Sequence, residues 1–380
     1  MSTSSQNLTS YESLALAGPL NLSDGHPRQA PTESQAAILD QMTPLYRGAG
    51  HSTFEKVETH AHERFFSALG QKSAPIGTGR VLSCYSSSVA VDIFARALRD
   101  RTDRVGLLHP TFDNIPDLLR AWGHNLVPVA ETALSAHDDS VFDGDIGCVF
   151  VTTPNNPTGW VMLPETMRWL ARECSARGVV LALDTSFRGF DTRAWYDHYA
   201  ILEESEVDHV VIEDSGKLWP TQELKAGFLV AGAGDLPLVD AFSDVLLTIS
   251  PFVLALLGEF AADAADGGFA RLHAMVSEHR VFVRNALAEL NLPAPPDPES
   301  RVSVERVALP PGVSAGEAYT ALSDMDVHVL PCGPFHWDEP GEGDSFIRLS
   351  LARDTEMLRQ AVTRTASWLA QARASVGRPA

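Results

Sequence analysis

The apolar residues of this chain follow two patterns that alternate up to about residue 231. Short apolar runs without polar interruption, VGLL, CVFV, VVLAL and VVI, are typical of strands buried on both faces, as in a parallel sheet covered by helices. Other segments carry apolar residues at helical spacing. The predicted strands are 77–83, 104–108, 125–130, 147–153, 178–184 and 209–213, and the predicted helices are 33–46, 53–69, 114–122, 165–177 and 195–204. This alternation predicts an α/β fold with a mostly parallel central sheet.

The pattern changes beyond Ala231. Three long helices, the proline-rich segment LNLPAPPDPES, three short strands and a closing helix follow, which predict a smaller α+β domain. The helices are 236–247, 252–263, 268–290 and 356–374, and the strands are 301–309, 327–330 and 346–351. We therefore expect a large domain over 31–270, whose start belongs partly to the small domain, and a small C-terminal domain over 271–380.

Composition and charge exclude several classes of protein. The chain has 380 residues, 44% of them apolar, no basic leader and no apolar run long enough to span a membrane, so we expect a cytoplasmic globular protein. A formal net charge of -20 argues against nucleic acid and anionic membranes as partners. The four cysteines lack CxxC spacing, and His60 and His62 face apart on a helix, so no metal is expected.

Polar and aromatic side chains recur just after the predicted strands. They are Phe112, Asn156, Asp184, Asp214 and Lys217. Ligands of open α/β sheets bind at the carboxyl ends of the strands, so these residues predict a site there. Lys217 lies in a short polar turn between two apolar runs, where an amine can react with an aldehyde. A solvated lysine in a surface hairpin is the other interpretation.

Three serines, Ser86, Ser87 and Ser88, come directly before an amphipathic helix. Serines at a helix start cap free backbone amides, and the same amides bind phosphate with help from the helix dipole. Plain capping and a phosphate site both fit this pattern.

Pyridoxal phosphate (PLP) needs a lysine for a Schiff base, a carboxylate at the pyridine nitrogen, a stacking ring, a phosphate site and an arginine for a substrate carboxylate. The chain supplies these groups in order: Asn156 in NNPTG, Asp184 at the end of VVLALD, Lys217, then Lys225, and Arg348 in FIRLSLAR. With these motifs, the chain resembles the fold-type I PLP enzymes of the class I/II aminotransferase kind over essentially its whole length.

This resemblance implies a role for each residue. It assigns the Schiff base to Lys217, the pyridine nitrogen to Asp184, the ring hydroxyl to Asn156, ring stacking to Phe112, the phosphate and its surroundings to Ser86, Ser87, Ser88, Ser215 and Lys225, and the substrate carboxylate to Arg348. The chain departs from the family at two positions. Phe187 stands where a tyrosine is common, so Ser186 is expected to supply the hydroxyl. Asp214 stands where a serine near the phosphate is common, and we expect it to point away from the phosphate.

The chain also resembles a narrower group, the PLP-dependent L-arginine oxidases and hydroxylases of antibiotic biosynthesis. The stretches that carry this resemblance are NLTSYESLAL, LNLSDGHPRQA, RVLSCYSSSV, HPTFDNIPDLLR, VTTPNNPTGW, LALDTSFRGFD, IEDSGKLWP and DPESRVSVERVA. It implies use of dioxygen without metal or flavin, and a homodimer. It also implies that 1–30 form a lid carrying Thr9, that Glu12 and Asp214 face the guanidinium, and that His26 lies near the reacting carbon. A loop histidine without a catalytic role is the alternative for His26.

We therefore hypothesise oxidation of L-arginine to 4-hydroxy-2-oxoarginine, 2-oxoarginine or both, with release of ammonia and hydrogen peroxide. Lys217 would move the α-proton, and water would add at the γ carbon after a second oxidation. An arginine desaturase-oxidase and an ordinary aminotransferase remain alternatives. A PLP-binding regulatory module is disfavoured because no DNA-binding domain is present, and an NAD enzyme because no GxGxxG follows a first strand.

Overall fold

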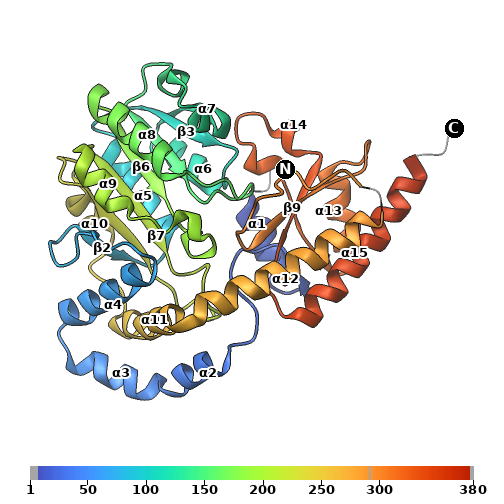
Figure 1. The fold of residues 1–380 in the computed structure, drawn as a ribbon, viewed down its shortest axis with the longest axis horizontal. Coiled ribbons are helices and arrows are strands. Elements are labelled where there is room, and N and C mark those ends of the chain that lie inside the picture. Colours follow the sequence, from blue (N-terminus) through green and yellow to red (C-terminus); the bar gives the residue numbers. More distant parts are fainter. Residues whose placement is uncertain (1–6, 291, 377–380) are drawn as a thin grey trace.

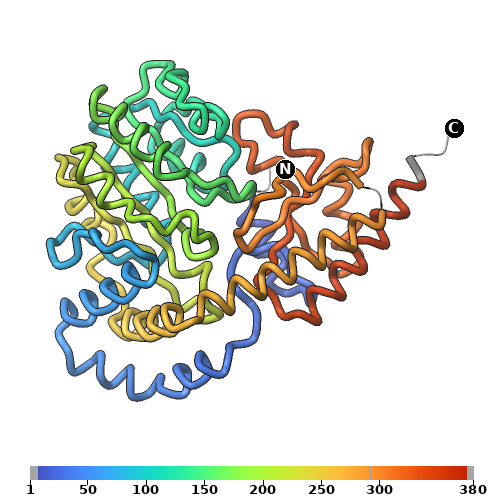
Figure 2. The backbone as a smooth tube through the Cα atoms, viewed as in Figure 1, coloured from blue at the N-terminus to red at the C-terminus, as the bar shows by residue number. Residues whose placement is uncertain are grey.

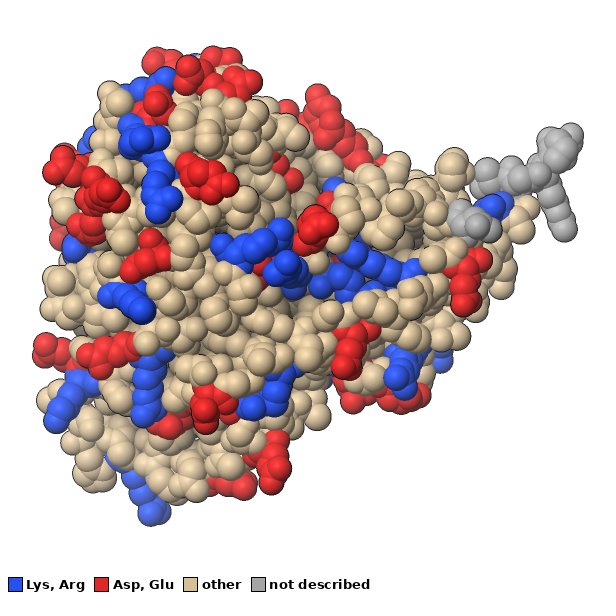
Figure 3. Space-filling view, viewed as in Figure 1, with Lys and Arg blue, Asp and Glu red and all other residues tan. Residues whose placement is uncertain are grey.

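The structure of the protein is a computed structural model that describes residues 7–290 and 292–376. Figure 1 shows two groups of elements, joined by the long helix α12 (Phe269–Ala288). The first six residues of the expected lid lie outside the described residues. Among the described helices, none is both long and apolar enough to cross a membrane. Acidic side chains are spread over the face seen in Figure 3, in line with the net charge.

A seven-stranded sheet with the order β2-β8-β7-β6-β5-β3-β4 forms the larger group. Strands β3 to β7 pair in parallel, and β8 is antiparallel to both of its neighbours. The strands are β2 (Val81–Cys84), β3 (Arg104–His109), β4 (Asn125–Ala130), β5 (Cys148–Thr152), β6 (Val180–Asp184), β7 (His209–Asp214) and β8 (Gly227–Ala231). Asp184 is paired with Thr152 on β5 and with Ile212 on β7, so three strands end at one edge. The expected α/β fold with a mostly parallel sheet is confirmed.

Both faces of this sheet are buried, because alternate residues of its strands enter two different cores. On β6, Leu181 and Leu183 pack in one core, whereas Val180 and Ala182 pack in the other. The first core is covered by α4 (Phe54–Ala68), α8 (Pro164–Arg177), α9 (His198–Ser205) and α11 (Pro251–Asp263). The second is covered by α5 (Ser87–Leu98), α6 (Asn114–Ala121) and α10 (Leu238–Val245). The uninterrupted apolar runs of the sequence are therefore explained by helices on both sides.

The smaller group contains a three-stranded antiparallel sheet with the order β11-β12-β9. Its strands are β9 (Val304–Ala308), β11 (Leu330–Pro331) and β12 (Phe346–Ser350), and its helices include α13 (Ala315–Ser323), α14 (Pro340–Gly343) and α15 (Thr355–Val376). The N-terminal strand β1 (Leu20–Asn21) pairs in parallel with β10 (Val327–His328). The start of the chain therefore lies beside the C-terminal elements, as the blue and orange segments of Figure 2 show.

Several predicted elements differ from the structure; the strand expected over 77–83, for example, begins only at Val81. The helix expected over 33–46 is divided into α2 (Glu33–Asp40) and α3 (Met42–His51). Pro44 cannot donate a hydrogen bond to Asp40, and its ring disfavours a continuous helix there. The strand expected over 327–330 forms two short strands, β10 and β11. The helix expected from residue 195 begins at His198, because the Asp197 side chain caps it by accepting from the Ala200 amide at 3.2 Å.

The polar N-terminal tail contains a helix that the sequence pattern did not predict. Helix α1 spans Leu8–Ala15 and begins where the Asn7 side chain accepts from the Ser10 amide at 2.9 Å. Leu8 is fully buried, and the Tyr11 ring meets Tyr319 edge to face at 4.6 Å. The tail is thus anchored to the body of the protein, mainly to the smaller group.

Candidate active site

Lys217 lies in the turn between β7 and β8, as the sequence predicted. Two side chains fix this turn: Asp214 Oδ1 accepts from the Gly216 amide at 2.6 Å, and the Ser215 hydroxyl donates to the Ala226 carbonyl at 2.9 Å. The N-terminal segment passes close by, since a Cβ added at Gly25 would be 3.7 Å from Lys217 Nζ. The amine therefore stands at the carboxyl edge of the sheet, beneath residues from the start of the chain.

Asp184 ends β6 with a buried carboxylate. Its Oδ1 accepts from the Ser186 hydroxyl at 2.6 Å and from the Ser186 amide at 2.9 Å. Burial raises the pKa of Asp184 to about 6, against the effect of these hydrogen bonds and of Lys217. A carboxylate held in this way is well suited to pair with a protonated ring nitrogen. Ser186 orients that carboxylate, and its predicted place beside a cofactor stays a prediction.

The three serines lie at the start of α5, close to the Lys217 turn. Ser86 caps the helix by accepting from the Val89 amide at 3.3 Å, and Ser88 accepts from Asn114 Nδ2 at 2.7 Å. Ser87 donates to Asp214 Oδ2 at 2.9 Å. A Cβ added at Gly227 would be 2.5 Å from the Ser86 carbonyl carbon, so glycine is needed for strand β8 to pass this helix start.

Asp214 contacts this helix start, and its expected orientation away from a bound phosphate stays a prediction. Its Oδ1 closes the turn at Gly216, which leaves Oδ2 directed at Ser87. The local turn geometry, which the spacing of charges did not reveal, sets this direction. The predicted contact of Asp214 with a guanidinium stays a prediction.

His26 and Lys225 are in direct contact, with 2.9 Å between His26 Nε2 and Lys225 Nζ. Lys225 also pairs with Glu223 at 2.6 Å. The charge of Lys217, followed by burial and the charge of Lys225, lowers the pKa of His26 far below its ordinary value. His26 is therefore a neutral imidazole beside both lysines, able to position water through a hydrogen bond.

Arg348 on β12 is a fully buried arginine with free hydrogen-bonding capacity. Its Nη2 donates to the Ser23 carbonyl and lies 3.6 Å from Glu12 Oε1, whereas Nε and Nη1 have no partner among the described residues. Burial raises the pKa of Glu12 even though Arg348 lowers it. A buried guanidinium with unpaired donors is a suitable site for a carboxylate.

The remaining predicted residues are Asn156, Phe112 and Thr9. Asn156 is buried and its Oδ1 has no partner among the described residues. The Phe112 ring meets Phe335 at 5.9 Å, and Phe335 in turn lies 5.6 Å from the Arg348 guanidinium carbon. Thr9 is exposed on α1, and its carbonyl accepts from the Ser13 hydroxyl. The structure therefore groups Phe112 with the centre, while the substrate role of Thr9 stays a prediction.

Asp24 and Arg353 position the backbone of the N-terminal segment, a role that was not predicted from the sequence. Arg353 is fully buried and donates to the carbonyls of Asn21 at 2.6 Å and His26 at 2.7 Å. Burial alone would raise the pKa of Asp24, but Arg353 and Arg28 outweigh burial and lower it. Together they hold the backbone that carries Gly25 and His26 over Lys217. The only signal in the sequence was a second arginine, which lies soon after Arg348 and beyond the end of β12.

Asp113 fixes the N-terminal helix to the larger group. Its Oδ2 accepts from the Leu8 amide at 2.6 Å. Burial raises the pKa of Asp113 to about 7, above its ordinary value of 3.8. At a pH between 3.8 and about 7, Asp113 is protonated in the folded protein but ionised in the unfolded chain. Acidification from about pH 7 therefore stabilises the folded state.

Asp113→Asn should remove this pH dependence while keeping an acceptor for the Leu8 amide. We expect the wild type to gain about 2 kcal/mol in unfolding free energy relative to the variant between pH 7.5 and pH 5. Urea denaturation at both pH values measures it. Asp240→Asn, at an exposed position of α10, is the matched control. The prediction would be contradicted if the wild type and Asp113→Asn differed in unfolding free energy by the same amount at both pH values.

The chain belongs to the class I and II aminotransferases, because that family model matches residues 17–364. It is 50% identical to MppP in a structure soaked with the product 2-ketoarginine, with a TM-score of 0.90, covering 92% of this chain and all of that one. It is 27% identical over 344 residues to an aromatic amino acid aminotransferase of Mycobacteroides abscessus, covering 88% of this chain and 93% of the relative.

The fold is shared with LysN, the α-aminoadipate aminotransferase of Thermus thermophilus, in its complex with N-(5'-phosphopyridoxyl)-L-leucine. That structure is 19% identical, has a TM-score of 0.79, and covers 98% of this chain and 96% of that chain. The expected membership of the class I/II family is confirmed.

The residues at the sheet edge fit PLP, the cofactor of this family. Ser87 and Lys225, which contact Asp214 and Glu223 in this structure, can turn to a phosphate as a hydroxyl and a cation at the start of helix α5. Asn156 Oδ1, which has no partner among the described residues, can accept from a ring hydroxyl. Asp184 and Lys217 provide the carboxylate and the amine that the pyridine nitrogen and the aldehyde need. The protein is thus a PLP-dependent enzyme of the aminotransferase family.

Proposed function

We propose that this enzyme oxidises L-arginine with dioxygen to 4-hydroxy-2-oxoarginine, 2-oxoarginine or both, releasing ammonia and hydrogen peroxide, in the biosynthesis of an antibiotic or related natural product. The observation that carries the proposal is the 50% identity to MppP, whose structure was solved with its product 2-ketoarginine. 2-Ketoarginine is another name for 2-oxoarginine, the 2-oxo acid formed when a carbonyl replaces the α-amino group of arginine.

Arg348 binds the substrate α-carboxylate in this proposal. Its Nε and Nη1, which have no partner among the described residues, keep N–H donors free for the oxygens of a carboxylate. Glu12 lies 3.6 Å from Nη2, so a second carboxylate at Arg348 would be repelled by it. Substrate binding therefore requires Glu12 to turn from Arg348 towards the guanidinium end of arginine, which couples binding to helix α1.

PLP, when bound, supplies an electron sink for the α carbon, and dioxygen accepts the electrons without metal or flavin. The residues of the chain handle protons and water. Lys217 Nζ moves the α-proton, and Asp184 keeps the ring nitrogen protonated. His26 stays neutral beside Lys217 and positions the water that adds at the γ carbon. Asn156 and Ser186 orient the ring, and Phe112 stacks on it.

Several organisational features belong to the same proposal. We place the lid over 1–30, the large domain over 31–270 and the small domain over 271–380, in a cytoplasmic homodimer. Support for the lid comes from α1, which lies against Arg348 through Glu12 and against Asp113 through the Leu8 amide.

Removal of residues 1–16 should separate the lid from the chemistry. It deletes α1 but keeps β1, which pairs with β10, and the Asn21–His26 backbone held by Arg353. We expect the truncated enzyme to consume oxygen with arginine but to release 2-oxoarginine in place of the 4-hydroxylated product, because water is no longer positioned. Mass spectrometry of the products measures the ratio. A full-length Leu16→Ala variant, altered at an exposed position, is the control. Normal hydroxylation by the truncated enzyme would rule out the lid role.

The origin of the hydroxyl oxygen tests the proposed reaction. Incubation with arginine in ¹⁸O-labelled water should give a 4-hydroxylated product that carries the label at C4, once exchange at the carbonyl is reversed in ordinary water. A product with a carbon–carbon double bond and no hydroxyl would favour the desaturase-oxidase. A label derived from dioxygen would contradict the addition of water.

A further inference from the structure

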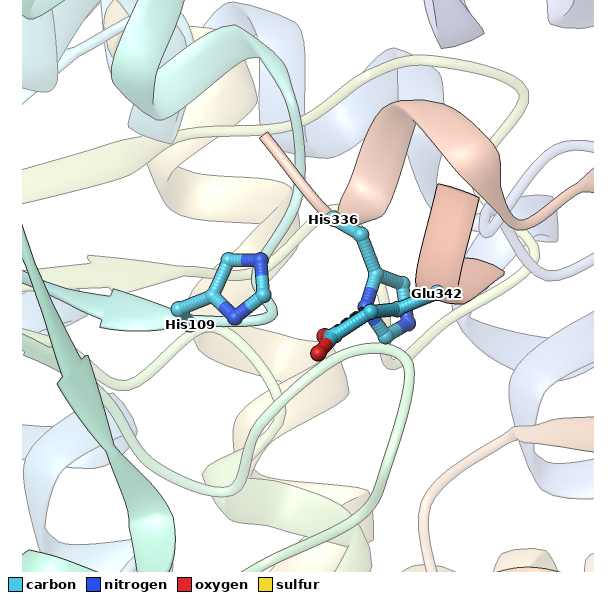
Figure 4. Close-up of side chains that lie close together, drawn as sticks. All are labelled: His109, His336 and Glu342. Carbon is cyan, nitrogen blue, oxygen red and sulfur yellow. Dashed lines mark hydrogen bonds and ion pairs between the residues drawn. The ribbon is translucent and has the colours of Figure 1, made fainter. Parts of the chain in front are cut away.

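Two histidines and a glutamate outside the candidate active site face one another (Figure 4). His109 is the last residue of β3, His336 directly follows the 3₁₀ turn Gly333–Phe335, and Glu342 belongs to α14. One nitrogen or oxygen atom of each lies within 4.8 Å of those of the other two. His336 Nδ1 is 3.2 Å from Glu342 Oε2, and the two imidazole rings are 5.3 Å apart.

Both imidazoles keep unused hydrogen-bonding capacity in a buried place. His109 Nε2 and His336 Nε2 are buried and have no partner among the described residues. Most buried polar atoms of folded proteins are paired, so the orphaned His109 nitrogen beside the His336–Glu342 pair calls for an explanation. A ligand that accepts its lone pair provides one.

The charges around the cluster suit a cation. Three carboxylates, those of Glu342, Asp338 and Glu339, act electrostatically on His109. Neutral imidazole together with carboxylate is a donor set that divalent transition metals, zinc above all, bind well.

We propose that His109, His336 and Glu342 bind a divalent transition metal ion of the zinc type. Tetrahedral zinc with bonds near 2.0–2.1 Å needs donor atoms about 3.4 Å apart, so small rotations of His109 and Glu342 complete the site. Water takes the fourth position. The ion is structural and takes no part in the oxidation, and its binding would overturn the expectation from the sequence that no metal is bound.

The site would clamp the two groups of elements together. His109 ends a strand of the seven-stranded sheet, whereas His336 and Glu342 lie between β11 and β12 of the smaller sheet. The same junction already holds two hydrogen bonds, from the Thr111 amide to the Phe335 carbonyl at 3.0 Å and from Trp337 Nε1 to the Leu108 carbonyl at 2.9 Å. A bound ion would therefore stabilise this junction, three residues before Phe112.

Calorimetric titration of Zn²⁺ into the tag-free holoenzyme, freed of metals with a chelator, tests the proposal. The wild type should bind one equivalent that is lost in the double variant His109→Gln/His336→Gln. Glu342→Gln, at an exposed position that the fold tolerates, should weaken binding at least about tenfold. His51→Gln, at an exposed histidine on α3, should bind as the wild type does.

A second measurement keeps the result clear if a histidine variant folds poorly. Co²⁺ in place of Zn²⁺ should give visible absorption bands of a tetrahedral site in the wild type and in His51→Gln, but not in Glu342→Gln. Zn²⁺ should also raise the melting temperature of the wild type and not that of Glu342→Gln. Equal binding by the wild type and Glu342→Gln, or a full equivalent bound by the double variant, would overturn the proposal.

Discussion

Arg348→Lys is expected to lower kcat/KM for arginine about 100- to 1000-fold, mostly through a higher KM. Lysine keeps the charge but loses the planar fork, and its ammonium cannot fill the positions of Nε and Nη1, which have no other partner among the described residues. Glu12, partly buried 3.6 Å from Nη2, also loses this guanidinium contact. Steady-state kinetics over a range of arginine concentrations measures the change.

Arg306→Lys is a control from the same sheet. Arg306 on β9 is the partner of Arg348 in the strand register, but its guanidinium binds Asp297 at 2.8 Å. This variant should keep the KM of the wild type within about threefold. If both variants raised KM equally, the assignment of the substrate carboxylate to Arg348 would be wrong.

Lys217→Ala should abolish turnover, with a loss of about 10⁴-fold or more. The Lys217 amine lies beside Gly25 at the sheet edge, where we expect it to form the Schiff base. The variant should also lack the absorption band of a lysine-bound cofactor, and borohydride should leave no label on its peptide. Lys72→Ala, at an exposed position, should behave as the wild type. Retained activity in Lys217→Ala would remove the basis of the scheme.

The sequence predicted most of the large sheet because its signals are local. An apolar run such as that of β6 identifies a buried strand without information from distant residues. Asp184, Asn156 and Lys217 each follow or end such a strand, which places them at one edge of the sheet. The order and spacing of these residues predicted the cofactor because they are those of a known family. The resemblance to a known family then assigned roles that spacing alone did not give.

Other features depend on contacts between distant segments. Helix α1 is stabilised by Asp113 and Tyr319, neither of which its own sequence reveals. Arg353 is buried because the N-terminal strand folds back on it. The direction of Asp214 depends on one backbone amide at Gly216.

The histidine cluster shows the same limit. His109 and His336 belong to different groups of elements, and no spacing motif joins them. Only the packing of β3 against the segment after β11 brings their rings together. Metal-ligand motifs are recognised in a sequence when the ligands are close along the chain, which is not the case here.

Oxygen consumption during turnover tests the central claim most directly. The purified PLP-loaded enzyme, given arginine in air-saturated buffer without any 2-oxo acid, is predicted to take up oxygen as ammonia and a 2-oxo product form, and to stop under argon. An enzyme that consumed no oxygen and converted arginine only when a 2-oxo acid was added would be an aminotransferase, and the proposed oxidation would be contradicted.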